Sequence, residues 1–135
     1  MHDPNSAGLH LILDGYVADP STFSRSSLEE LFSHLAEALD MQVILGPNFV
    51  EVELDPKKLT GDAFQDEGGI TGMCVISTSH MSIHCWPLRK CFSMDVFSCK
   101  DFDAGEALSV IRKKLGVVGL RVTRVDRRFP GQNDD

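Results

Sequence analysis

The sequence predicts an α+β fold, a two-layer sandwich in which two helices cover one face of a mostly antiparallel sheet. Several short stretches alternate apolar with more polar residues, which indicates strands. Two other segments repeat apolar residues every three or four positions, which indicates amphipathic helices. The predicted order is strand, helix, strand, strand, strand, helix, strand. No linker divides the 135 residues, so we expect a single domain spanning residues 1–135.

The first half of the chain supplies a strand, a helix and another strand. Apolar residues at every second position from Leu9 to Leu13 predict the first strand. Ser27 and Glu30 form a capping-box pattern at the start of the first helix. Residues 41–54 predict a strand or a kinked pair of strands, interrupted by Gly46 and Pro47. The apolar stripe of the helix consists of Leu28, Leu31, Phe32, Leu35 and Leu39.

The central stretch predicts a hairpin with arms at residues 73–86 and 91–99. Proline favours a turn between them, and a turn centred on Leu88 and Arg89 gives paired residues whose numbers sum to about 177 or 178. Ser79 then faces Ser98 or Cys99. His84 falls on the opposite face of a regular strand, about 16 Å from Ser79. The two would act together only if the strand bulged or bent.

The remaining segments complete the predicted fold. Residues 55–69 form a polar loop in which Phe64 is the one large apolar residue. Asp103 and Glu106 make a capping pattern ahead of a second helix, which Gly116 closes. Residues 118–125 predict the last strand. The stripe of the second helix consists of Ala107, Leu108, Ile111 and Leu115.

Composition restricts the partners that the chain can have. A net charge of −7 disfavours nucleic acid or an anionic membrane as the main partner. No apolar run approaches the length of a membrane span, and the start lacks the pattern of a secretory signal, so we expect a cytoplasmic location. In that compartment we expect the cysteines to be free thiols rather than disulfides. We also expect no metal, because the spacings between the cysteines and histidines do not fit a zinc site. The four cysteines are Cys74, Cys85, Cys91 and Cys99.

The segment GITGMCVISTSHMSIHCWP, followed by MDVFSC, resembles the bacterial and archaeal S-adenosylmethionine decarboxylases. That family carries a Gly-x-Ser/Thr-Gly segment, a Ser-His pair, Ile-His-x-Trp-Pro and Asp-x-Phe-x-Cys in this order. The resemblance extends from Gly8 through the final strand. It implies a pyruvoyl-dependent decarboxylase that acts on S-adenosylmethionine and supplies its product to spermidine biosynthesis. It also implies a homodimer of αβ units.

The resemblance further implies that the chain cuts itself. In the family, the serine that matches Ser79 attacks the preceding carbonyl, here that of Thr78. The products would be a β chain, residues 1–78, and an α chain, residues 79–135. Ser79 would become a pyruvoyl group, a covalent cofactor whose ketone withdraws electrons from a bound substrate as pyridoxal phosphate does in other enzymes.

Three more residues match reactive positions of the family. His84 matches the processing histidine, and an imidazole that titrates near neutral pH suits proton transfer. Cys99 matches the cysteine that returns a proton to the product carbon. Thr71 matches a hydroxyl that assists self-cleavage. The hairpin register, which uses no resemblance, also places Cys99 beside Ser79.

Two positions depart from the family's pattern. Thr78 stands where a glutamate commonly precedes the cleaved serine. Leu88 stands where a glutamate commonly follows Trp-Pro and accepts hydrogen bonds from the ribose hydroxyls. Leaving these buried hydroxyls without an acceptor costs about 1–3 kcal/mol of binding free energy. Arg89 or Lys90 could instead meet a substrate carboxylate. The candidate substrate contacts are Phe64, Met81, Trp86 and Leu88.

These departures leave two other readings open. A pyruvoyl-dependent arginine or ornithine decarboxylase would use the same chemistry on a smaller substrate. A homologue that is not processed would act as a binding or regulatory subunit. All three readings use the same fold, so the site must separate them.

Overall fold

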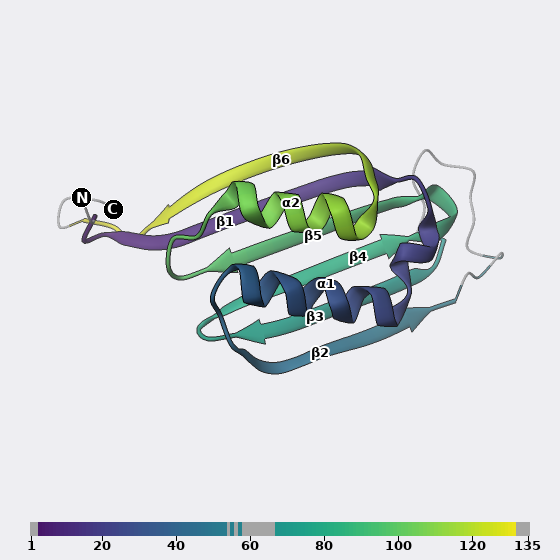
Figure 1. Cartoon of the computed structure of the whole chain (residues 1–135), viewed down its shortest axis with the longest axis horizontal. Helices are drawn as coiled ribbons and strands as arrows, with labels where there is room; N and C mark the ends of the chain where they lie inside the picture. The colour runs from purple at the N-terminus through teal and green to yellow at the C-terminus, as the bar shows by residue number, and fades with distance from the viewer. Residues whose placement is uncertain (1–2, 54, 56, 58–66, 132–135) are drawn as a thin grey trace.

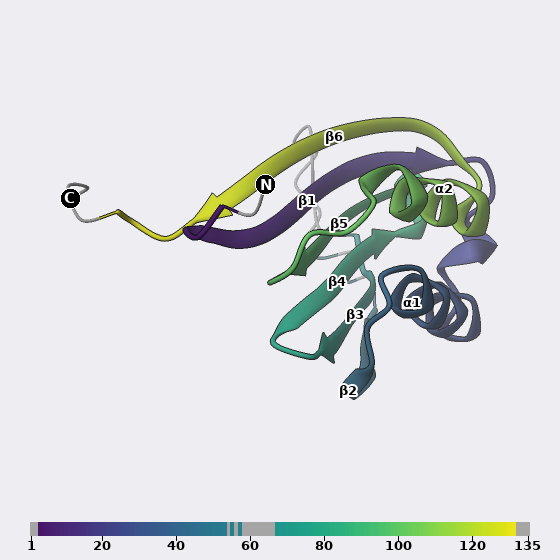
Figure 2. The same cartoon turned by 60° about the vertical axis from the view of Figure 1, so that its left-hand side comes forward.

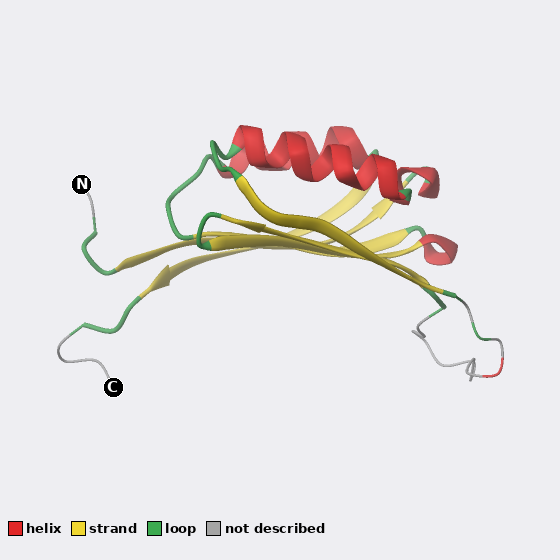
Figure 3. Cartoon of the chain, turned by 90° about the horizontal axis from the view of Figure 1, so that it is seen from below, coloured by secondary structure: helices red, strands yellow, loops and turns green. Residues whose placement is uncertain are grey.

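The computed structural model describes residues 3–53, 55, 57 and 67–131. In this part of the chain, six strands form one antiparallel sheet and two α-helices lie side by side on one of its faces (Figure 1). Seen along the sheet in Figure 3, the opposite face carries no helix among the described residues. The predicted two-layer α+β sandwich is therefore confirmed.

The first strand of the chain lies inside the sheet rather than at its edge. The strand order is β2-β3-β4-β5-β1-β6, so β1 pairs with both β5 and β6. Figure 2 shows β1 and β6 running together along one side of the molecule. The strands are β1 (Ser6–Val17), β2 (Val43–Val52), β3 (Gly69–Ile76), β4 (Ser79–Trp86), β5 (Cys91–Ser98) and β6 (Val117–Arg128).

The two helices, α1 (Arg25–Ala38) and α2 (Ala104–Leu115), form the second layer. Both bury the predicted apolar stripe against the sheet, which removes that surface from water. A 3-10 helix, η1 (Pro20–Phe23), connects β1 to α1. Neither α-helix in the described residues has the length and apolar character that crossing a membrane requires. The buried residues on the helices are Leu28, Leu31, Phe32, Leu35, Ala36, Ala107, Ile111 and Leu115.

One of the two predicted helix starts is wrong by three residues. Ser24, not Ser27, caps α1, because its side chain accepts a hydrogen bond from the backbone N–H of Ser27 at 3.2 Å. Ser27 therefore already belongs to the first turn. The start of α2 is as predicted, with Asp103 accepting from the N–H of Glu106. Gly116 ends α2 with a φ of +66°, a conformation that glycine adopts without strain.

The stretch predicted as one strand, residues 73–86, is two strands. β3 ends at Ile76, and Ser77 and Thr78 form a turn into β4. Sequence patterns missed this turn because it contains none of the glycine, proline, asparagine or aspartate residues that mark turns. Thr78 instead adopts a φ of +51°, which is uncommon for a residue with a branched Cβ. The turn makes Ser79 the first residue of β4.

The register of the second hairpin, between β4 and β5, is as predicted. His80 pairs with Phe97 and Trp86 pairs with Cys91, so paired numbers sum to 177. A short 3-10 helix, η3 (Pro87–Arg89), forms the connection. No register shift interrupts β4 against either neighbour. The bulge that would bring Ser79 and His84 to one place is therefore absent from this described part of the chain.

The region around the predicted loop differs in two respects from the sequence prediction. β2 runs through Gly46 and Pro47 as one strand whose register against β3 shifts between Val43 and Asn48. β3 begins at Gly69, within the residues predicted as loop. Phe64, the predicted substrate contact of this loop, lies outside the described residues.

Candidate active site

The turn into β4 places three chemically useful side chains together, Thr78, Ser79 and Cys99, here called the serine cluster. The side chain of Ser79 is buried, and its Oγ accepts a hydrogen bond from the backbone N–H of Cys99 at 2.9 Å. The Oγ1 of Thr78 lies 2.9 Å from the Sγ of Cys99 and donates to the carbonyl of Ser77 at 2.8 Å. The hydroxyls of Thr78 and Ser79, the carbonyl of Ser77 and the thiol of Cys99 therefore lie close together.

The thiol of this cluster differs from the others in the chain. Hydrogen bonds with Thr78 and then with Ser79 lower the pKa of Cys99 below its ordinary value of 9.0, and the residue is exposed. Burial raises the pKa of Cys74 and Cys91, and burial raises that of Cys85 to about 12. Cys99 is therefore the thiol best placed to exchange a proton with a reacting group.

A second group, Thr71 and His84, forms what we call the histidine pair. These residues stand directly opposite each other in β3 and β4, and Thr71 Oγ1 lies 2.9 Å from His84 Nδ1. This contact occupies Nδ1 and leaves Nε2 as the ring nitrogen that does not contact Thr71. The pair and Trp86 line a small cavity of about 90 Å³.

The glycines on either side of Thr71 are required by space. A Cβ on Gly69 would lie 1.9 Å from the carbonyl oxygen of Cys85, and its φ of +153° also disfavours other residues. A Cβ on Gly72 would lie 2.6 Å from the ring of Phe49. The Gly-Ile-Thr-Gly segment therefore lets β3 approach its neighbours closely while it presents Thr71 to His84.

The serine cluster and the histidine pair are separate within one chain. β4 is regular between them, so five residues of strand separate Ser79 from His84 by about 16 Å. The burial pattern of β4 alternates, with Ser79 on the helix-covered face and His84 on the open face. The structure thus groups Thr78, Ser79 and Cys99 as predicted, but not with His84.

The open face of the sheet carries a network that the sequence interpretation did not identify. The Nε2 atoms of His10 and His80 both lie within hydrogen-bond distance of Asp95 Oδ2, at 2.8 and 2.9 Å, and Ser82 donates to Asp95 Oδ1. Burial favours a higher pKa for Asp95, but these hydrogen bonds outweigh it and lower the pKa. The register of β1 and β4 against β5 indicates this network, because His10 and His80 both pair with Phe97, two residues from Asp95.

Among the described residues, this network is the group that could hold a metal. The candidate ligand atoms of His10, His80 and Asp95 lie within 4.8 Å of one another. Both imidazoles, however, contact the same carboxylate oxygen at hydrogen-bond distance, so hydrogen bonding accounts for the arrangement. The hydrogen bond to Asp95 holds the imidazole of His80, the residue after Ser79, in place.

A cavity of about 470 Å³ lies where η3 meets the ends of β2 and β3. Leu88 lines it together with three carboxylates, Glu51, Glu53 and Glu67. Arg89 pairs with Glu67 at 2.9 Å, so its charge is already balanced by a carboxylate of the protein. The cavity consequently favours a cation over an anion.

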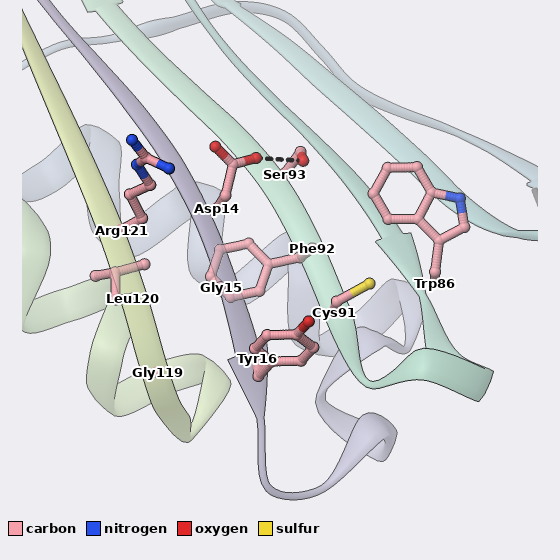
Figure 4. Close-up of a pocket in the computed structure, with 10 residues that line it drawn as sticks. All are labelled: Asp14, Gly15, Tyr16, Trp86, Cys91, Phe92, Ser93, Gly119, Leu120 and Arg121. Atoms are coloured by element: carbon pink, nitrogen blue, oxygen red, sulfur yellow. Dashed lines mark hydrogen bonds between the residues drawn. The ribbon is translucent and has the colours of Figure 1, made fainter. Parts of the chain in front are cut away.

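Another cavity of about 470 Å³ lies on the open face, beside Tyr16 and Trp86 (Figure 4). Asp14 and Arg121 give it one charge of each sign, and Ser93 donates to Asp14 at 2.6 Å. Trp86 is the one predicted site residue in its lining. Met81, predicted to contact substrate, is fully buried in the core and lines neither cavity.

The fold and the two reactive groups define an α+β protein with a buried serine at a strand-opening turn, a neighbouring thiol and a hydroxyl–imidazole pair. Comparison with known proteins identifies the family to which this fold belongs. The family model described as S-adenosylmethionine decarboxylase matches residues 9–128. The chain belongs to the S-adenosylmethionine decarboxylase family.

Individual relatives cover different shares of the sequence. The S-adenosylmethionine decarboxylase proenzyme of Hydrogenobaculum sp. is 35% identical over 95 residues, which are 70% of this chain and 60% of the relative. That of Clostridium botulinum (strain Loch Maree / Type A3) is 27% identical over 113 residues, 81% of this chain and 84% of the relative. The match to the proenzyme of Pseudomonas paraeruginosa, 38% identical over 64 residues, spans only 40% of that protein's length.

A solved structure shows the same fold. The crystal structure of the adenosylmethionine decarboxylase from Aquifex aeolicus superposes with a TM-score of 0.68 at 21% sequence identity. The superposition covers 97% of this chain and 98% of that one. The strand order and the helix layer are therefore shared along nearly the whole chain.

The hydrogen bonds around Cys99 predict its reactivity. In the Ser79→Ala chain, which retains the Thr78 contact, we expect iodoacetamide to label Cys99 before the other cysteines. A lowered pKa places more thiolate at a given pH, so the midpoint of its pH–rate profile should fall below 9.0. Peptide mass mapping assigns each label, and Cys99→Ser is the control. Faster labelling of Cys91 would contradict this result.

Proposed function

We propose that this chain is the precursor of a pyruvoyl-dependent S-adenosylmethionine decarboxylase. The observation that carries the proposal is the position of Ser79, buried at the first residue of β4 with its Oγ held by the N–H of Cys99. This serine directly follows the Thr78 carbonyl and lies beside a thiol. The relatives are named S-adenosylmethionine decarboxylase proenzymes, which supports both the activity and a precursor form.

The proposed cleavage begins when Ser79 Oγ attacks the carbonyl carbon of Thr78. The amide C–N bond breaks, the hydroxyl proton passes to the released amine, and an ester remains. Removal of the Cα proton of Ser79 then expels Thr78 as a carboxylate. Hydrolysis of the resulting enamine releases ammonia and leaves a pyruvoyl group at residue 79. The products are residues 1–78 and 79–135.

The surroundings of Ser79 fit such a group. Once formed, a pyruvoyl ketone would supply the electron sink that decarboxylation of an amino acid requires. Cys99 would hold the proton that is returned to the product carbon, because its thiol lies at this end of β4 and its pKa is lowered. His80, held by Asp95, would keep the new N-terminal residue in place.

We further infer that a homodimer completes the site. His84 of one chain cannot reach its own Ser79 along a regular strand, whereas a second copy can supply its histidine pair to the serine cluster. The sheet face that no α-helix covers (Figure 3) offers the surface for such a partner. Large apolar side chains remain exposed on this face. These include Ile12, Tyr16, Met73 and Val75, which are 37%, 59%, 57% and 41% exposed.

The cavity beside Leu88 supports S-adenosylmethionine as the substrate. A sulfonium cation suits a cavity whose lining carries Glu51 and Glu53 in addition to the paired Glu67. Either of the first two carboxylates can replace the ribose acceptor that Leu88 lacks. Arg89, being paired, has no need of a substrate carboxylate.

The proposed place of action is the cytoplasm. All four cysteines are free thiols in the structure, which is typical of a reducing compartment. The substrate is a small molecule, and the net charge of −7 gives no support for a nucleic-acid partner.

Self-cleavage is directly testable by intact-mass spectrometry. We expect the purified protein to show two chains, cut between Thr78 and Ser79. The shorter chain, residues 79–135, should lack a free N-terminal amine, since the serine has lost its amino group. Ser79→Ala should remain whole, because no hydroxyl remains to attack. A single full-length chain after prolonged incubation of the native sequence would overturn the enzymatic proposal and favour a regulatory homologue.

Complementation tests the composite site. Neither Ser79→Ala nor His84→Ala should mature efficiently alone, since one lacks the nucleophile and the other the proton carrier. In a mixed dimer, an intact Ser79 can meet an intact His84, so co-expressed variants should cut the His84→Ala chain. Different affinity tags separate the two chains for mass measurement. Full-rate cleavage of His84→Ala by itself would show that this imidazole is not required.

The substrate is tested by release of labelled carbon dioxide from S-adenosylmethionine, arginine and ornithine. We expect release from S-adenosylmethionine, with Leu88→Glu lowering KM by about 5–100-fold through recovered hydrogen bonds. Glu51→Gln should raise KM if this carboxylate contacts the substrate. Release from arginine or ornithine alone would identify the smaller-substrate decarboxylase instead.

A further inference from the structure

Thr78 occupies a backbone conformation that L-residues avoid. Its φ is +51°, and its branched Cβ makes this conformation less favourable than it is for asparagine or aspartate. The other described non-glycine residues with positive φ, Asp40 and Lys90, directly follow the ends of α1 and η3, where such values are common. Thr78 differs because it precedes the peptide bond that is proposed to break.

The neighbours of Thr78 prevent the chain from relaxing. Only Ser77 and Thr78 connect Ile76, which is fully buried, to the buried Ser79. The imidazole of His80 is fixed by Asp95 on the opposite face of the sheet. A strained residue persists when its surroundings fix the chain on both sides, as they do here.

The side chain of Thr78 adds a further restraint. Its Oγ1 contacts both the carbonyl of Ser77 and the Sγ of Cys99, at 2.8 and 2.9 Å. The turn is therefore held from its outer side by Cys99 at the end of β5. Rotation of Thr78 toward a relaxed φ would have to break these contacts.

We propose that the strained backbone at Thr78 accelerates cleavage of the Thr78–Ser79 bond; this inference rests on the self-processing proposed above. In the uncut turn, the link from Thr78 to β4 is one peptide bond. When Ser79 Oγ replaces the amide nitrogen on the Thr78 carbonyl carbon, the released amine takes the hydroxyl proton. The Thr78 carbonyl carbon is then joined to the Cα of Ser79 through two atoms, Oγ and Cβ, instead of through the nitrogen alone. The longer link lets Thr78 leave the left-handed region, so the reaction releases the strain.

The test compares Thr78→Gly with Thr78→Ala. Both variants lack the hydroxyl, and they differ only in the Cβ that makes positive φ unfavourable. Full-length chains made by rapid cell-free synthesis are followed over time by intact mass. We expect the alanine variant to cut about 5–30-fold faster than the glycine variant, the factor that corresponds to the usual cost of left-handed backbone.

A matched pair elsewhere controls for general effects of glycine. Asp40 also has a positive φ but lies after α1, away from the turn, so Asp40→Gly and Asp40→Ala should cut at equal rates. Thermal unfolding of the Thr78 variants in the uncut Ser79→Ala background shows whether both are folded. A difference between the Asp40 variants that matches the Thr78 difference would assign the effect to overall stability and overturn the inference.

The remaining outcomes separate this inference from the proposed function. If the native sequence cuts and both Thr78 variants slow equally, the hydroxyl rather than the strain matters, and the inference is wrong. If the glycine variant cuts as fast as the alanine variant or faster, it is likewise wrong. If the native sequence never cuts, the proposed function itself is overturned.

Discussion

The pairing of β4 with β5 is the constraint on which the rest of the site depends. It brings the N–H of Cys99 to the Oγ of Ser79, although twenty residues of chain separate them. Apolar side chains on the helix-covered face hold this register, among them Ile83 on β4 and its partner Met94 on β5. A slip of one residue would turn Ile83 to the open face and remove Cys99 from Ser79.

The same regularity separates the two reactive groups. A strand without a bulge cannot bring residues five positions apart into contact, and β4 shows no register shift against either neighbour. The fold therefore places the hydroxyl of Ser79 at one end of β4 and the imidazole of His84 near the other. Because the α-helices cover only one face, the other face of the sheet remains open, as the proposed homodimer requires (Figure 3).

Patterns in the sequence predicted what depends on periodicity and short-range chemistry. Both helices, the fold class and the β4–β5 register follow from apolar spacing and from the proline that begins η3. The turn at Thr78 could not be predicted in this way, because its positive φ is imposed by the buried residues on either side. The start of α1 was misplaced because two serines, Ser24 and Ser27, compete as caps and only the packed chain decides between them.

The network around Asp95 shows a different limit of sequence reasoning. Its members come from β1, β4 and β5, and β1 joins β5 only because the first strand enters the middle of the sheet. Hairpin arithmetic could place His80 near Asp95, but His10 requires the full strand order. Once that order is known, the network explains why His80 is fixed although it is half-exposed, with an exposed side-chain fraction of 45%.

The two departures from the family's pattern affect different parts of the chemistry. At position 78 the proposed cleavage would use a backbone carbonyl, so replacing a glutamate side chain by threonine would leave the reacting atoms unchanged. At position 88 the side chain itself would meet the substrate, so leucine removes an acceptor from the cavity. The cavity nonetheless holds Glu51 and Glu53, and Glu67 balances Arg89. The lining of the cavity therefore carries negative charge although position 88 is a leucine, which supports the cationic substrate proposed above.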